Sequence, residues 1–60
     1  MFEIEAYNEE AGQWDLVKEV NEYEFEGAYG VFKTYLNKNI AKTGLRLLND
    51  RGLIVRLCHA

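Results

Sequence analysis

The hydrophobic periodicity of this chain changes twice within its 60 residues. In residues 2–6 and again in residues 14–20, apolar and polar side chains alternate with the period of two that is typical of a half-buried strand. In residues 25–37 the apolar side chains recur at steps of three and four, the period of a helix that buries one face. Two further apolar segments flank a turn-like sequence near residue 50. The pattern therefore predicts two strands, one helix and two more strands.

The first two strands are predicted to form a hairpin, because the Asn and Gly of residues 8–12 suit a hairpin loop. The simplest register places Ala6 opposite Trp14 on an apolar face, which Ile4, Leu16 and Val20 would share. The same register sets Glu5 beside Asp15 on the opposite face, where two like charges repel across the ladder.

A helix is expected from about Phe25 to Asn37, with Asn37 and Asn39 as stop signals. Its apolar stripe consists of Ala28, Val31, Phe32, Tyr35 and Leu36. A second stripe contains the small residues Gly27, Gly30 and Thr34. Because a glycine in a helix costs about 1 kcal/mol relative to alanine, one interpretation is the close approach of a partner helix. The other is that Gly27 marks a late start of the helix.

The last two strands are predicted to form a second hairpin around residues 49–52, where Gly52 takes the left-handed conformation of a type I turn with a bulge. The expected register opposes like residues on both faces. On the buried face it pairs Leu47 with Val55 and Leu45 with Leu57; on the other it pairs Arg46 with Arg56 and Leu48 with Ile54.

These elements predict an α+β fold of the order ββαββ, in which one helix packs on one face of a four-stranded, mainly antiparallel sheet. Residues 1–60 are expected to form a single small domain. The one cysteine, Cys58, excludes an internal disulfide and favours a reducing compartment, for which we expect the cytoplasm. We expect neither a secretory signal nor a membrane span, because no apolar run approaches the roughly 20 residues that a span needs.

The charges of the chain are polarised. Residues 1–32 carry nine acidic side chains and one basic side chain, whereas residues 33–60 carry six basic side chains and one acidic side chain, so the net charge of −3 combines −8 and +5. The charges are neutralised within the fold if the first and last strands are neighbours, which brings Glu3 and Glu5 close to Arg56 and Arg46. Otherwise they are available to a second copy or to a partner, and the sequence leaves the strand order open.

One helix covers only one face of such a sheet. The uncovered face is expected to hold apolar side chains among the charges, namely Tyr7, Val17, Leu48, Ile54 and Cys58, which is more than a solvated face requires. This composition predicts a partner or dimer interface. The partner-binding residues that we predict are Glu3, Glu5, Arg46, Ile54 and Arg56.

No catalytic, cofactor or metal site is predicted. Cys58 and His59 supply two soft ligands where zinc needs four, so a Cys2His2 site would require two copies around a two-fold axis. The chain contains no serine and one histidine, which excludes a Ser-His-Asp triad. Its carboxylates lie in a turn or along exposed strands, whereas general acid catalysis needs a carboxyl group with a raised pKa. We therefore expect no enzyme.

Two alternatives remain open at this stage. A nucleic-acid-binding module would use the basic second hairpin, with Tyr7 and Tyr35 as stacking platforms, although the pI of 5.0 and the acidic half of the chain oppose it. Its basic residues would be Lys33, Lys38, Lys42, Arg46, Arg51 and Arg56. The other alternative is a structural homodimer with no separate ligand.

In size and layout the chain resembles the short accessory proteins of bacteriophages, including small inhibitors of host RNA polymerase and phage antitoxins that pack one helix on a small sheet. The resemblance rests on the strand at Trp14–Val20 that leads into the helix at Phe25–Leu36, and on the terminal strand at Leu53–Cys58. It implies a class of action, in which the protein binds one host or phage protein and blocks or adapts it. It assigns no site residue.

Overall fold

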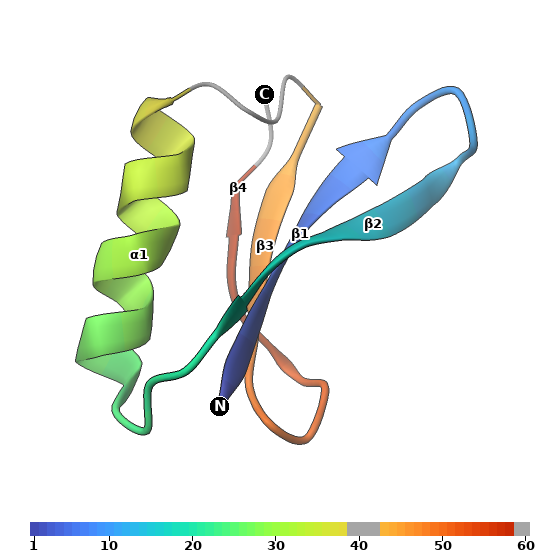
Figure 1. Cartoon of the computed structure of the whole chain (residues 1–60). Coiled ribbons are helices and arrows are strands. Elements are labelled where there is room, and N and C mark those ends of the chain that lie inside the picture. Colours follow the sequence, from blue (N-terminus) through green and yellow to red (C-terminus); the bar gives the residue numbers. More distant parts are fainter. Residues whose placement is uncertain (39–42, 59–60) are drawn as a thin grey trace.

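The computed structural model describes residues 1–38 and 43–58. Its elements follow the predicted order: β1 (Phe2–Asn8), β2 (Gln13–Val20), α1 (Phe25–Asn37), β3 (Leu45–Leu48) and β4 (Ile54–Cys58). The four strands form one antiparallel sheet of order β2-β1-β3-β4, and α1 stands beside it (Figure 1). The α+β fold is therefore confirmed, and β1 neighbours β3 rather than the last strand. The predicted stop signal Asn39 lies outside the described residues.

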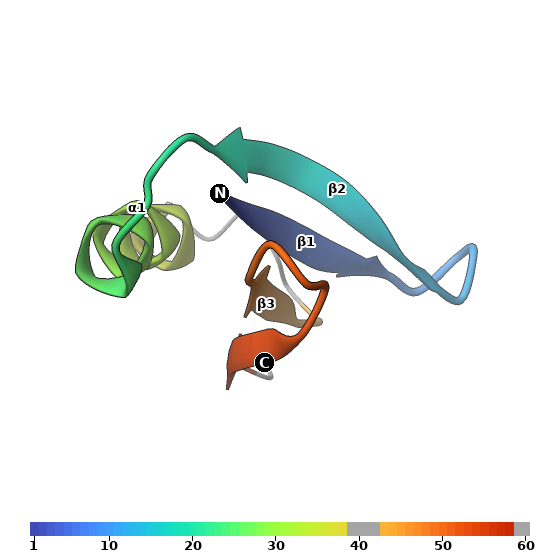
Figure 2. The same cartoon turned by 90° about the horizontal axis from the view of Figure 1, so that it is seen from below.

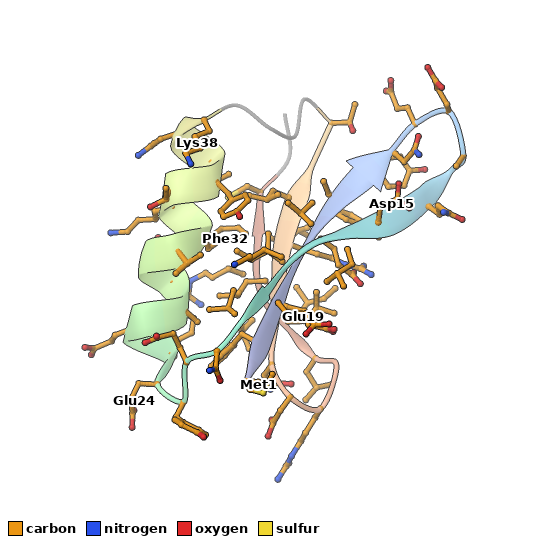
Figure 3. The ribbon with its side chains drawn as sticks, in the orientation of Figure 1. Met1, Asp15, Glu19, Glu24, Phe32 and Lys38 are labelled. Atoms are coloured by element: carbon orange, nitrogen blue, oxygen red, sulfur yellow. The ribbon has the colours of Figure 1, made fainter. Side chains whose placement is uncertain are left out.

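The core lies between α1 and the two central strands. Ile4 of β1, Leu47 of β3 and Phe32 of α1 are fully buried there. Figure 3 shows Phe32 pointing from α1 toward the sheet. Both views of the ribbon show the β1–β2 hairpin extending past the helix, so its turn end lies away from the core (Figures 1 and 2). The helix therefore covers one face of the sheet, and only part of that face.

The predicted register of the first hairpin is wrong. A β-bulge between the Ile4 and Glu5 pairs makes β2 longer than β1 by one residue, and Val17 is the extra residue. Glu5 consequently pairs with Leu16 instead of Asp15, and Trp14 pairs with Tyr7. Because a shift of one residue moves side chains to the other face, Trp14 and Leu16 lie on the uncovered face and not on the apolar face where the sequence pattern put them.

The second hairpin departs from its predicted register in the same way. Leu48 pairs with Ile54 as expected, but a bulge follows and Val55 is the extra residue. Beyond it Leu47 pairs with Arg56, and Arg46 pairs with Leu57. The predicted opposition of Arg46 and Arg56 is therefore wrong, and the two arginines lie on opposite faces of the sheet.

Both turns form where the sequence placed them. Gly12 and Gly52 have positive φ angles of 66° and 78°, which glycine adopts without steric strain. In the second turn the Asn49 side-chain Oδ1 accepts hydrogen bonds from the backbone N–H groups of Arg51 (2.9 Å) and Leu53 (3.0 Å). These bonds fix the turn that joins β3 to β4.

Replacing Gly30 with alanine is expected to stabilise the domain. The helix begins at Phe25, so the late start at Gly27 is wrong and both glycines are helical. A Cβ at Gly30 would meet nothing within 4 Å, whereas one at Gly27 would meet the Glu22 carboxylate. We expect Gly30→Ala to raise the free energy of unfolding by about 1 kcal/mol in urea denaturation. Loss of partner binding in this variant would instead indicate that a partner backbone approaches α1 at Gly30.

Candidate functional site: the open sheet face

The sheet face that α1 leaves uncovered, here called the open face, holds three rows of side chains. Strand pairing defines the rows, because residues paired across an antiparallel ladder project to the same side. In strand order, the first row is Glu19, Glu3, Leu48 and Ile54, the second is Leu16, Glu5, Arg46 and Leu57, and the third is Trp14 and Tyr7. Of the predicted partner-binding residues, Glu3, Glu5, Arg46 and Ile54 are thus brought together on this face.

An ion pair that is stacked on an aromatic ring occupies the centre of the open face. The Arg46 guanidinium donates to the Glu5 carboxylate through Nε (2.7 Å), and its Nη2 lies 2.6 Å from the same oxygen. The guanidinium carbon also lies 4.3 Å from the centre of the Trp14 ring, and Trp14 packs edge-to-face against Tyr7. These contacts engage both long side chains, so the middle of the open face is a polar platform in which an ion pair is stacked on an aromatic ring.

Exposed aliphatic side chains flank this platform on both sides. Leu16 on β2 is 51% exposed, and Ile54 and Leu57 on β4 are 49% and 44% exposed. None of the three belongs to the core cluster or packs against it. Leu16 and Leu57 were not among the predicted site residues, because the bulges that turn them outward were not predicted. Exposed aliphatic side chains on an uncovered sheet face supply apolar area that a partner can bury.

Three residues that were expected on the open face lie elsewhere. Arg56 pairs with Leu47 on the side of the sheet that faces α1, and its guanidinium stacks on Phe25, 4.6 Å from the ring centre. Val17 and Cys58 pack against the core cluster. The bulge at Val55 causes the change at Arg56, since it reverses the alternation of β4 beyond that point.

An acidic hollow lies at one end of the open face, where the β3–β4 turn passes the start of β1. Its volume is about 500 Å³, and its lining residues include three acids, Glu3, Glu19 and Asp50, together with the N-terminal Met1. Figure 3 shows Glu19 on the side of the sheet away from α1. Glu3 and Glu19 are paired directly across the β1–β2 ladder. In residues 1–38 and 43–58 the only ion pair is that of Glu5 with Arg46, so no base described there lies within ion-pair distance of these acids.

A second hollow of about 550 Å³ lies on the helix side of the sheet. Phe2, Phe25, Val55 and Arg56 contribute to its lining. The Arg56 guanidinium is stacked over Phe25 and lies 5.4 Å from the Tyr29 ring centre, so it is held within this aromatic group. This hollow therefore contains the stacked Arg56 guanidinium and one acidic residue, Asp50, which also lines the acidic hollow.

Asp15 lies on the extended part of the first hairpin, away from α1 (Figure 3). Its carboxylate accepts hydrogen bonds from the side-chain amides of Gln13 (2.8 Å) and Asn8 (3.0 Å). These two hydrogen bonds hold the pKa of Asp15 below its ordinary value of 3.8, and the bond from Gln13 has the larger effect. A general acid requires a raised pKa, so this carboxylate is suited to bracing the hairpin and not to donating a proton.

The Asp15 hydrogen bonds give a pH dependence that can be tested. Because the pKa is lowered in the folded state, the carboxylate stabilises the fold above its unfolded pKa, and this contribution is lost as the pH falls through the folded pKa. We expect wild type to unfold at a higher urea concentration than Asp15→Asn at pH 7, and the difference to disappear as the pH falls through the folded pKa of Asp15. A difference that persists at low pH would show that the carboxylate charge is not its source.

The basic residues of the C-terminal half do not form a free stripe. Lys33, Lys38, Arg46 and Arg56 each lie over an aromatic ring of the same chain, at 4.3–5.8 Å from the ring centres. Lys42, which the nucleic-acid alternative also needs, lies outside the described residues. The stacking residue Tyr7 is itself packed against Trp14. The described residues therefore offer no run of unengaged cations to a phosphate backbone.

Residues 1–38 and 43–58 contain no cluster of metal-binding side chains and no helix of membrane-spanning length and character. No group of three or more His, Cys, Asp or Glu side chains there could hold a metal ion, and His59 is not among the described residues. Within the same residues, no helix has the length and apolar character needed to cross a membrane.

Comparisons with known proteins return no relative. No family model matches the chain, no curated protein matches its sequence, and no solved structure matches its fold. A functional conclusion must therefore be drawn from the open face itself.

Proposed function

We propose that this protein is a non-enzymatic protein-interaction module that binds one partner protein through its open face. The observation that carries the proposal is the position of Leu16, Ile54 and Leu57, which are about half exposed and flank the Glu5–Arg46 ion pair on the face that α1 leaves uncovered. A central polar platform supplies specificity and register, and aliphatic side chains around it supply the apolar area that is buried on binding.

The mode of action that we propose is inhibition or adaptation of the partner, as in the small bacteriophage accessory proteins that the chain resembles. A domain of 60 residues is large enough to cover a functional surface on a larger protein. The residues proposed to contact the partner are Glu3, Glu5, Leu16, Arg46, Ile54 and Leu57. Arg56 is left out, because its guanidinium stacks on Phe25 on the helix side.

The first experiment is capture from a bacterial lysate with the tagged full chain, with and without nuclease, followed by mass spectrometry. We expect one protein that is retained in about equimolar amount and resists nuclease. Recovery of nucleic acid alone, lost on nuclease treatment or with added salt, would contradict the proposal and favour the basic alternative. Light scattering on the purified chain tests the homodimer, for which the mass would be twice that of one chain.

A further inference from the structure

The pairing of Glu3 with Glu19 is electrostatically unfavourable within the domain. The two residues are direct partners across the β1–β2 ladder, and like charges in such a pair repel. In the described part of the chain no base forms an ion pair with either of them. The bulge at Val17 replaces the predicted Glu5–Asp15 contact with a Glu5–Leu16 pair, but it leaves this second acidic pair in place. An arrangement that costs stability within the fold is often explained by binding.

The acidic pair borders both the hollow and the aliphatic part of the open face. Glu3 and Glu19 line the hollow together with Asp50 of the β3–β4 turn. Along the same row of the sheet, Glu3 is followed by Leu48 on β3 and then by Ile54 on β4. A ligand that spans this row would meet negative charge at one end and aliphatic surface at the other.

A second copy of this chain does not match that chemistry. In the three rows of the open face the only base is Arg46, and it is already paired with Glu5. Arg56 stacks on the helix side. Two copies docked through their open faces would therefore bring no unpaired lysine or arginine of these rows against the acidic hollow of the other copy.

From this charge complementarity we infer that the partner surface carries a lysine or arginine side chain next to aliphatic side chains. The basic side chain enters the hollow between Glu3 and Glu19, and the aliphatic side chains lie against Ile54 and Leu57. This inference rests on the proposed function, since it names the chemistry of the partner that the open face binds.

The test selects binders from a yeast-displayed library of random peptides of about twelve residues, which in extended form are long enough to cross four strands. Selection uses the immobilised full chain, and the affinities of the enriched peptides are then measured for wild type and for Glu3→Gln/Glu19→Gln. The matched control is Glu9→Gln/Glu10→Gln, which removes the same charge from exposed residues of the β1–β2 turn. The Gln variant relieves a repulsion, so we expect it to remain folded.

We expect the enriched peptides to carry lysine or arginine beside aliphatic residues, and to bind Glu3→Gln/Glu19→Gln at least about tenfold more weakly than the control variant. Enrichment of neutral or acidic peptides, equal affinity for both Gln variants, or no enrichment would overturn the inference. Ile54→Thr/Leu57→Thr separates the two claims. If the enriched peptides are neutral but bind this variant more weakly than wild type, the open face remains the binding surface and only the inference of a basic partner fails. If the peptides bind this variant as tightly as wild type, the proposed function fails as well.

Discussion

We expect Phe32→Ala to leave the domain largely unfolded at 25 °C. Phe32 is fully buried and is the largest such side chain, contributed by α1 to a core that otherwise comes mainly from the sheet. Removing a buried phenylalanine costs about 3–5 kcal/mol, through lost transfer free energy and the cavity that remains. In a domain of 60 residues without a disulfide, a single core rarely supplies more than about 3–5 kcal/mol of stability, so this loss removes most of it. Circular dichroism in urea measures the change.

The control for this prediction is the same substitution at Phe25, a half-buried residue at the start of α1. Phe25→Ala loses contacts with Tyr29 and Arg56 but opens no closed cavity, so we expect a clearly smaller loss. Equal losses in the two variants would contradict the location of the core between α1 and the central strands.

The second large effect is expected on binding. Ile54→Thr/Leu57→Thr removes aliphatic surface from the open face, yet places β-branched threonine, which favours a strand, at both positions. Both residues are close to half exposed, so the fold should lose little stability. Burying two exposed aliphatic side chains on binding contributes about 2 kcal/mol or more together, so we expect the affinity for the captured partner to fall at least about 30-fold. Calorimetric titration measures it.

Tyr23→Thr is the matched control for the binding variant. Tyr23 is 87% exposed and lies in the connection between β2 and α1, away from the open face. Its replacement removes a larger exposed apolar side chain without touching the sheet. An affinity loss in Tyr23→Thr equal to that in the open-face variant would show that binding depends on exposed apolar surface in general and not on this face.

The elements of the fold follow from local sequence. The alternation in β1, the helical stripe around Phe32 and the turn at Asn49–Gly52 each act over a few residues, and each is found where the pattern placed it. Local preferences of this kind are set by side-chain periodicity and by the φ angles that glycine allows. The same locality explains why α1 begins at Phe25, as its stripe predicted.

The set of side chains on the open face could not be predicted from these local patterns, because it depends on two β-bulges. A single extra residue at Val17 and another at Val55 reverse the alternation of β2 and β4, which turns Leu16 and Leu57 outward and Arg56 toward α1. A signal was nevertheless present in the sequence. Each uninterrupted register placed like charges opposite each other, Glu5 with Asp15 and Arg46 with Arg56, and each bulge removes that contact.

Strand order was the other property that local patterns did not contain. The charge split of the chain allowed its two halves to neutralise each other only if the right strands were neighbours. With β1 between β2 and β3, Glu5 reaches Arg46, but Glu3 meets Leu48 on one side and Glu19 on the other. Neutralisation is therefore partial, and the acids that remain are those of the hollow.

The most direct test of the open face as a binding surface is methyl NMR of the full chain, titrated with the protein that lysate capture returns. Labelled leucine, isoleucine and valine methyl groups report on both faces of the sheet. We expect the signals of Leu16, Ile54 and Leu57 to shift or broaden on binding, while those of Val31 and Leu36 on α1 stay unchanged. Shifts confined to the α1 methyl groups would contradict the proposal and place the binding surface on the helix.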